Sequence, residues 1–371
     1  MSAYVFPIVS AFFTFIFIAL LAVIPYAVLQ YRKYGSISKL KVLIVFSFSF
    51  YLICAYYLII LPLPSQSFVA HLHTPWMQLV PFNALHYFIT NTVFRPLDPS
   101  TYVPALKQSA FLQPFFNFML TVPFGLYLRY FWKLSFKKVV LASFCLSLFF
   151  ELTQLSGLYF IYPRPYRLFD VDDLILNTLG GTCGYLIEPL FAKLFPPLSR
   201  LNYDAEQKRN VASFSRRAIA FVIDWIILLI IFIALGLLVP QLGLNNYLSY
   251  LGGVFIYFVI LPYFSKGTTI GKGAVKISLV AEDESAAGFL QLLFRQFLFY
   301  GLALGNLFYF IPLVLVKFDS DRGSSRAFYF TILAIAGIAL LLFLLDILVL
   351  MFKQNSKMFY EHMTNTREIG H

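Results

Sequence analysis

Long apolar stretches dominate this chain, and short polar segments separate them. Residues 42–61, for example, include no charged side chain. A helix of about 20 apolar residues is long enough to cross the hydrocarbon core of a membrane. By this criterion the pattern predicts about nine transmembrane helices, at residues 4–29, 42–61, 113–130, 139–157, 174–191, 218–239, 248–264, 294–316 and 327–351. The expected fold is an all-α, polytopic integral membrane helical bundle.

The composition agrees with this fold class and excludes a water-soluble globule. Hydrophobic residues make up 60% of the chain and charged residues only 12%, which leaves too little polar surface to cover a soluble protein. The net charge of +11 comes from Lys and Arg that lie mainly between the predicted spans. There they suit anionic lipid head groups. We therefore expect membrane lipids as partners and no nucleic acid.

Basic clusters between the spans predict the orientation of the chain. Arg32, Lys33, Lys39 and Lys41 follow the first predicted span. Because Lys and Arg are enriched in cytoplasmic loops, this loop is expected inside and the N-terminus outside. The same rule places the C-terminus inside and the segment after the span at 139–157 outside.

A single break in composition suggests a division into two membrane domains. The segment 201–210 (LNYDAEQKRN) is polar, and basic residues flank it. Domain boundaries usually fall in exposed polar linkers. We predict a membrane domain at residues 1–195, a cytoplasmic linker at 196–214 and a second membrane domain at 215–371.

A polar stretch interrupts the apolar pattern between residues 151 and 184. Glu151 and Gln154 are three positions apart on one predicted helix, and Asp173 and Asn177 are four apart on the next, so each couple shares a helix face. Polar groups at membrane depth are costly and usually functional. The candidate ligand-binding residues are Glu151, Gln154, Arg164, Arg167, Asp170, Asp172, Asp173 and Asn177.

Two interpretations of this stretch remain open. In the structural one, Asp170 caps a helix N-terminus, where peptide N–H groups favour negative charge. The other carboxylates are then solvated or paired with Arg164 and Arg167, and Asn177 bonds to Gln154. In the functional one, the arginines grip phosphate or carboxylate, and the acidic residues bind amides, sugar hydroxyls or a divalent cation on a lipid-anchored molecule.

Neither a metal site nor a cofactor is predicted. His71, His73 and His86 are not followed by a carboxylate or Cys at ligand spacing, so we expect solvated loop residues. Gly180 and Gly184 form a small-xxx-small pattern, which predicts close helix packing.

In the second half, Arg217 and Asp224 are two turns apart on one predicted helix. An Asp inside a span indicates an ion path or a buried ion pair. Asp346, in the last span, is a candidate to share this site. A salt-bridged Arg217–Asp224 clamp and a transport path both remain open, and the clamp is slightly favoured.

The first half resembles the VanZ-like family, named for a protein associated with teicoplanin resistance. The matching segments are Val80-Pro81-Phe82 with Asn83, 117–125 (NFMLTVPFG), 151–155 (ELTQL) and 167–181 (RLFDVDDLILNTLGG). The resemblance covers roughly residues 42–194. It adds Asn117 to the candidate ligand-binding residues and implies a multi-pass protein of the bacterial plasma membrane.

The second half resembles the RDD family. The match rests on Arg216-Arg217-Ala218 through Asp224, on 267–272 (GTTIGK), on Arg295 and on Thr366-Arg367. In the tail, Glu361 stands where the family normally has an Asp. Because some members look like cation/proton antiporters, the resemblance implies a transport hypothesis.

Three functional hypotheses follow. The first is a factor at the outer leaflet that acts on or near a lipid-linked cell-wall precursor or a lipoglycopeptide, and so confers teicoplanin-type tolerance. The second is a cation/proton antiporter, or another transporter, built on the RDD-like half. A membrane enzyme acting on a lipid head group is less favoured, because no nucleophile stands beside Glu151 in the sequence, and no catalytic residue is assigned.

Overall fold

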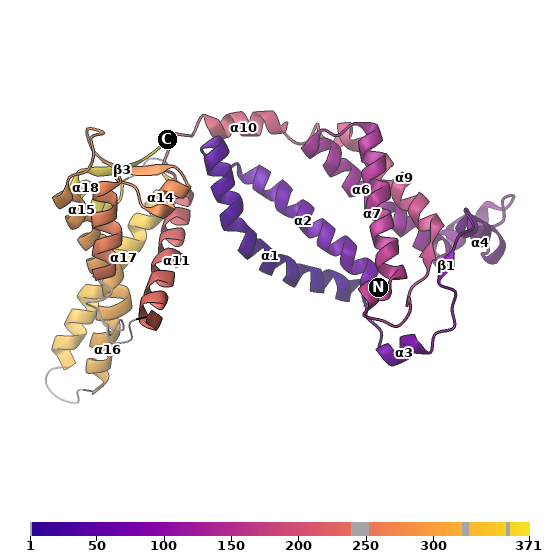
Figure 1. Cartoon of the computed structure of the whole chain (residues 1–371), viewed down its shortest axis with the longest axis horizontal. Coiled ribbons are helices and arrows are strands. Elements are labelled where there is room, and N and C mark those ends of the chain that lie inside the picture. Colours follow the sequence, from indigo (N-terminus) through magenta and orange to yellow (C-terminus); the bar gives the residue numbers. More distant parts are fainter. Residues whose placement is uncertain (1, 239–251, 321–325, 354–356) are drawn as a thin grey trace. The chain divides into compact units, whose positions relative to one another are not determined.

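A computed structural model of the protein describes residues 2–238, 252–320, 326–353 and 357–371 (Figure 1). The chain is almost entirely helical, with two small two-stranded sheets. Six helices in the described part are long and apolar enough to span a membrane: α1 (Ser2–Tyr34), α2 (Lys39–Ile60), α6 (Ser109–Trp132), α7 (Phe136–Leu155), α11 (Phe214–Leu238) and α17 (Arg326–Phe352). The predicted class, an all-α multi-pass membrane protein, is confirmed. The count of nine spans and the orientation stay predictions.

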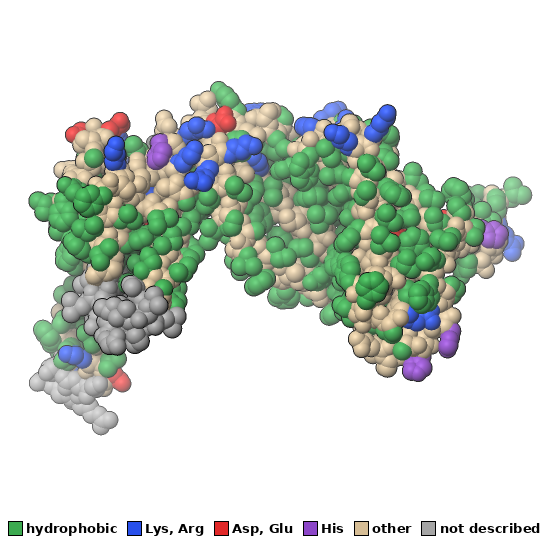
Figure 2. All heavy atoms as spheres, viewed as in Figure 1, with side chains coloured by type: hydrophobic (Ala, Val, Ile, Leu, Met, Phe, Trp, Pro, Cys, Tyr) green, Lys and Arg blue, Asp and Glu red, His purple; other side chains and the backbone are tan. Residues whose placement is uncertain are grey.

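The flanks of these helices suit a lipid environment. Phe13 and Phe17 on α1 and Leu229 on α11 are largely exposed, and Figure 2 shows hydrophobic side chains over much of the helix surfaces. Within each unit described below, Lys and Arg gather mainly at one end of the helices (Figure 2). Because exposed apolar surface of this extent is unfavourable in water, these helices contact membrane lipid.

The chain folds into two compact units. The first contains residues 2–21 and Lys39–Leu201, and the second contains Ala22–Ser38 and Asn202–His371. The division falls within α10 (Leu198–Glu206). Residues 22–38, the C-terminal part of α1 and the turn after it, belong with the second unit, a grouping that the sequence pattern does not indicate.

The first unit is a bundle in which α6, α7 and α9 (Val171–Phe191) pack together, with α2 beside them. Glycines allow α6 and α9 to touch through their backbones. A Cβ added at Gly180 or Gly184 would clash with the carbonyl oxygen of Phe118 or Val122, and one at Gly125 would clash with that of Gly181. The predicted close packing at Gly180 and Gly184 is confirmed.

Short elements cover one end of this bundle. They are α3 (Gln66–Ala70), β1 (Met77–Gln78), α4 (Asn83–Asn91), η1 (Pro99–Thr101), α5 (Tyr102–Leu106), α8 (Gly157–Phe160) and β2 (Phe169–Asp170). Strand β1 pairs with β2 in parallel, with Met77 opposite Phe169 and Gln78 opposite Asp170. This pairing brings the segment before α4 next to the start of α9.

The second unit combines the two long helices α11 and α17 with shorter helices and a sheet. Its further elements are η3 (Ile256–Ile260), α13 (Leu261–Phe264), α14 (Ile270–Ala274), β3 (Ile277–Ala281), α15 (Phe289–Gln296), η4 (Phe297–Leu304), η5 (Asn306–Phe310), α16 (Ile311–Ser320), α18 (Phe359–Thr364) and β4 (Thr366–Gly370). Strands β3 and β4 are antiparallel, which places the C-terminal strand beside the segment after α14.

The predicted span at 294–316 differs from the observed helix. The helical path runs from Phe289 to Ser320 and includes two π-helical segments, η4 and η5. Such segments widen the turn locally and are invisible to hydropathy. The connection between the predicted spans at 218–239 and 248–264, and residues 321–325 between the last two predicted spans, lie outside the described residues.

We expect Gly184→Ala to destabilise the first unit. The added methyl group meets the backbone of α6, which cannot move without separating two helices, and overpacking of this kind costs about 1–3 kcal/mol. Thermal unfolding of the purified protein in detergent measures the loss.

Gly337→Ala is the matched control for this change. Gly337 also lies inside a helix, α17, but a Cβ there would have no neighbour within 4 Å. Equal melting temperatures for the two variants would contradict the packing role of Gly184.

Candidate functional sites

The first candidate site is the acidic cluster of Glu151, Asp170, Asp172 and Asp173 in the first unit. Glu151 lies near the C-terminal end of α7 and is only 2% exposed. Its Oε2 accepts a hydrogen bond of 2.9 Å from the backbone N–H of Asp170. The end of α7 and the start of α9 therefore meet here.

Asp170 is the N-cap of α9, which confirms that part of the structural interpretation. Its Oδ1 accepts the backbone N–H of Asp172 at 2.9 Å and the side-chain amide of Gln78 at 3.3 Å. Burial raises the pKa of the Asp170 carboxyl, and the neighbouring charge of Asp172 acts in the same direction.

Asp172 stabilises a different helix, α4. Its Oδ1 accepts the backbone N–H of Phe82 at 2.6 Å and its Oδ2 accepts that of Ala84 at 2.7 Å. The N-terminus of α4 has no capping side chain of its own. A carboxylate from α9 takes that role, which is favourable at the positive end of a helix dipole.

Asp173 and Asn177 face the interior of the bundle. Oδ1 of Asp173 accepts a short hydrogen bond of 2.5 Å from the side-chain amide of Asn117 on α6. Asn177 donates to Oγ of Ser147 at 3.0 Å, and that hydroxyl donates to the backbone carbonyl of Asp173 at 3.2 Å. Oδ1 of Asn177 is buried and has no hydrogen-bond partner among the described residues.

The predicted bond between Asn177 and Gln154 is wrong. Gln154 donates instead to the carbonyl of Ile59 on α2, at 3.4 Å. Asn177 lies one turn further along α9 than Asp173 and meets Ser147, which is one turn before Glu151 on α7. The two side chains therefore lie at different depths along the helices.

The predicted salt bridges between the acidic cluster and the arginines are also wrong. Arg164 donates to the carbonyls of Leu72 and Thr74, and Arg167 donates to the carbonyl of Leu61 at 2.8 Å. The guanidinium groups thus hold the loop that follows α2. Among the described residues, no Lys or Arg forms a salt bridge with Glu151, Asp170, Asp172 or Asp173.

The histidines give no metal centre in the described part of the chain. A ring nitrogen of His71 lies 2.7 Å from the carbonyl oxygen of Ser67. No group of three or more His, Cys, Asp or Glu in the described ranges has the geometry to hold a metal ion.

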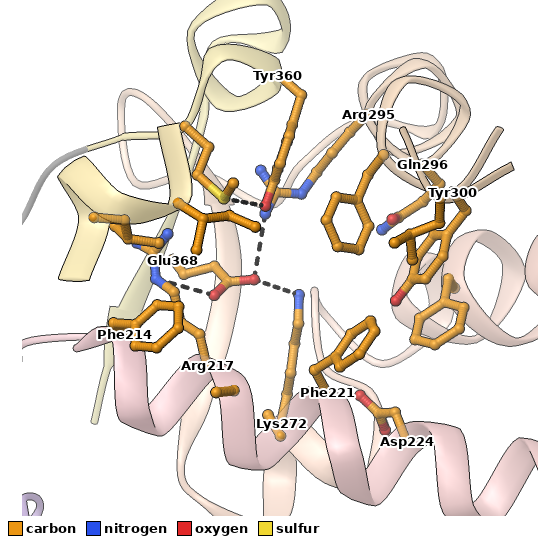
Figure 3. A pocket seen from close by; sticks show the side chains of 18 of the residues that line it. Phe214, Arg217, Phe221, Asp224, Lys272, Arg295, Gln296, Tyr300, Tyr360 and Glu368 are labelled. Carbon is orange, nitrogen blue, oxygen red and sulfur yellow. Dashed lines mark hydrogen bonds and ion pairs between the residues drawn. The ribbon is translucent and has the colours of Figure 1, made fainter. Parts of the chain in front are cut away.

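The second candidate site is a buried charge cluster in the second unit, formed by Arg217, Lys272, Arg295, Glu361 and Glu368. Glu361 is fully buried and pairs with Arg217 at 2.9 Å and with Arg295 at 3.0 Å. Glu368 on β4 pairs with Lys272 at 2.9 Å and with both arginines at 3.3 Å. Figure 3 shows the side chain of Glu368 reaching Arg217 and Lys272 from opposite sides.

Asp224 does not pair with Arg217, so the predicted clamp is wrong. The carboxylate of Asp224 accepts hydrogen bonds from the hydroxyl of Tyr257 at 2.8 Å, the hydroxyl of Thr269 at 2.6 Å and the backbone N–H of Gly271 at 2.6 Å. Arg217 forms salt bridges with Glu361 and Glu368 instead, both outside α11. Residue spacing along α11 could not reveal these partners.

Asp346 does not join Asp224. Its Oδ2 accepts the backbone N–H of Phe359 at 2.8 Å, at the start of α18. Asp346 therefore contributes to the helix terminus that carries Glu361.

A cavity of about 280 Å³ separates the buried charge cluster from a wall of aromatic rings. Arg217, Lys272, Arg295 and Glu368 line one part of it, and Asp224 and Gln296 line another (Figure 3). The aromatic wall consists of Phe221, Phe258, Phe299 and Tyr300.

Sequence reasoning missed Glu368 and Lys272 as parts of this site. It named Arg295 only as one of the residues that carry the resemblance to the RDD family. One signal was available. A charged residue at the end of an apolar domain is almost never buried without a partner of opposite charge, so Glu368 indicated a buried ion pair. The position of that partner depended on the pairing of β3 with β4, which one sequence does not give.

The fold and the two sites define a multi-pass helical membrane protein built from two units, each with its own buried polar network. Residues 48–192 match the VanZ/LLP1 family model, and residues 211–361 match the RDD family model. The chain therefore carries a VanZ-like domain followed by an RDD family domain. No curated protein and no solved structure matches the chain.

We expect Glu368→Gln to destabilise the RDD domain in a pH-dependent way. Burial alone would raise the pKa of Glu368, but Lys272, Arg217 and Arg295 outweigh it and hold that pKa well below its ordinary value of 4.5. A lowered pKa stabilises the fold fully above about pH 4.5, and this contribution falls as the pH drops below that value.

Removal of one partner from a buried ion-pair network costs about 3–5 kcal/mol. Glu368→Gln should therefore lower the melting temperature at pH 7, and the difference from the unaltered protein should shrink below pH 4.5. A difference that is constant with pH would show that the charge of Glu368 is not what stabilises the domain. The exposed Glu206→Gln serves as the control.

Proposed function

We propose that the protein acts at the outer face of the bacterial plasma membrane, where the VanZ-like domain binds a lipid-linked envelope component or a lipoglycopeptide. Binding of this kind raises tolerance to teicoplanin-type antibiotics by masking the target or altering access to it. The observation that carries the proposal is the acidic cluster, whose carboxylates form no salt bridge with a basic residue in the described chain.

The bonding of Glu151 and Asp173 supports a ligand at this place. Each accepts one hydrogen bond through one oxygen, Oε2 of Glu151 and Oδ1 of Asp173. A carboxylate accepts up to about four, and the second oxygen of each has no donor among the described residues. A buried carboxylate without a counter-ion is unfavourable, so a positively charged or hydrogen-bond-donating ligand group offsets a real cost.

The same geometry changes the expected chemistry of recognition. Arg164 and Arg167 donate to backbone carbonyls, so they are poorly placed to grip a phosphate. We propose instead that the cluster recognises donors on the ligand, namely an ammonium group, amide N–H groups or sugar hydroxyls. The alternative of an enzyme acting on a lipid head group stays less favoured, because the Glu151 side chain accepts its hydrogen bond from a backbone N–H and has no nucleophile as a partner among the described residues.

We expect Glu151→Gln combined with Asp173→Asn to abolish the tolerance. The amides keep the size of the side chains and remove the charge that attracts the ligand. The measurement is the minimal inhibitory concentration of teicoplanin in a susceptible bacterial host that expresses the full chain.

Glu206→Gln, an exposed change of the same chemistry outside the cluster, should leave the tolerance unchanged. The proposal fails if expression of the unaltered chain leaves the inhibitory concentration at the host's value. It also fails if the double variant protects as well as the unaltered chain while present at the same level in the membrane.

A second candidate function is transport through the RDD domain. The observation in its favour is Asp224, which is 1% exposed and still reaches the cavity. A carboxylate held by three neutral donors inside a membrane domain is suited to exchange a proton or a cation. The sequence resemblance favours a cation/proton antiporter.

We expect Asp224→Asn to abolish sodium-dependent proton movement under this second candidate. Inverted membrane vesicles and a pH-sensitive dye measure it. Asp204→Asn, an exposed change, is the control, and thermal unfolding shows whether the variant is folded. A folded Asp224→Asn protein with unchanged proton movement, or vesicles of the unaltered protein with none, would refute the candidate.

A further inference from the structure

The cavity of the RDD domain is large enough for an organic molecule. Its volume of about 280 Å³ is roughly twice that of an apolar cavity of about 150 Å³ that holds a benzene molecule. It is lined by both charged and aromatic side chains (Figure 3). Ligand sites typically combine an apolar wall with a few polar groups.

The buried charge cluster at one part of the cavity holds three positive groups and the two carboxylates Glu361 and Glu368, so it carries one net positive charge. Of the charged residues that line the cavity, three are basic, Arg217, Lys272 and Arg295, and two are acidic, Asp224 and Glu368. The carboxylate of Asp224 is engaged by neutral donors. The three basic groups all converge on the carboxylate of Glu368, with Lys272 the nearest at 2.9 Å.

Lys272 is the basic group best placed to bind a further anion. Arg217 and Arg295 are both held by Glu361 behind the cavity, whereas the salt bridge of Lys272 is to Glu368. An ammonium group has three donors. Figure 3 shows the amine of Lys272 reaching the carboxylate of Glu368, with Asp224 on the other side of the Lys272 side chain.

Gln296 supplies an independent sign of a ligand. It is only 7% exposed and lines the cavity, yet its side-chain amide has no hydrogen-bond partner among the described residues. Figure 3 shows this amide across the cavity from Glu368 and near Tyr300. The amide borders the cavity and can both donate and accept, so it is available to a polar group on a bound molecule.

The aromatic wall is suited to a flat apolar body. Phe258 stacks on Tyr300 with ring centroids 4.4 Å apart, and Phe299 meets the same ring edge-on at 4.7 Å. Phe221 lies nearly parallel to Tyr300 at 6.4 Å. Rings fixed by each other in this way form a rigid apolar surface, and aromatic ligands gain stacking energy on such surfaces.

We propose that this cavity binds a small organic anion with an aromatic body. The ligand's carboxylate lies against Lys272, its ring packs on Phe258 and Phe221, and Gln296 bonds to a polar edge. The inference rests on neither proposed function, because it concerns binding of an anion and not tolerance to an antibiotic or exchange of sodium.

The test uses the full chain in detergent and 2-naphthoate as the probe, with binding measured by calorimetry. We expect saturable binding that Lys272→Met weakens about tenfold or more, because truncation of a buried charge partner costs at least that much affinity. Lys272→Arg should restore most of the affinity, and Gln296→Leu should weaken binding by a smaller factor. Lys266→Met, at an exposed position, should change nothing.

One uncharged probe and one positively charged probe of similar size separate the effect of the ligand's charge from that of its ring. 2-Naphthalenemethanol should bind about tenfold more weakly than 2-naphthoate, and 2-naphthylmethylammonium should not saturate. The inference is overturned if the three probes bind equally, which is the result expected for partition into detergent. It is also overturned if Lys272→Met keeps full affinity while the protein retains its cooperative thermal unfolding.

Discussion

The structure depends on one constraint, that every charged side chain placed inside a low-dielectric domain must find a partner. In the RDD domain, Glu361 and Glu368 meet this requirement for Arg217 and Arg295 at distances of 2.9–3.3 Å. Isolated buried charges are costly, and removal of one member leaves the others uncompensated. The segment after the last span therefore cannot be a loose tail, because its carboxylates complete a network inside the domain.

The VanZ-like domain meets the same constraint only partly. Both carboxylate oxygens of Asp172 accept hydrogen bonds from the start of α4, and Asp170 caps α9. Two of the four acidic residues of the cluster therefore stabilise the fold. Glu151 and Asp173 retain accepting oxygens, and the nearby amide oxygen of Asn177 has no partner in the described chain. The oxygens of the cluster without a hydrogen-bond donor thus lie at the contact between α7 and α9. We propose that the ligand binds there.

The sequence predicted features that depend on local spacing. Apolar runs indicated the helical membrane fold, the position of Asp170 indicated an N-cap, and Gly180 and Gly184 indicated close packing. Partners that come from distant segments were not predictable in this way. The Arg217–Asp224 clamp was slightly favoured because both residues lie on one helix, but strand pairing brings Glu368 to Arg217. One of the two interpretations paired Arg164 and Arg167 with carboxylates, whereas both donate to backbone carbonyls of the loop after α2.

The hydrogen bonds of Asp172 also connect the candidate site to α4. Its carboxylate ties the first turn of a bundle helix to the surface helix α4, and the neighbouring residues Asp170 and Asp173 belong to the candidate site. A ligand that moves this turn acts on α4 through these two hydrogen bonds. Because α4 has no buried residue, the bonds join a site inside the bundle to an exposed helix.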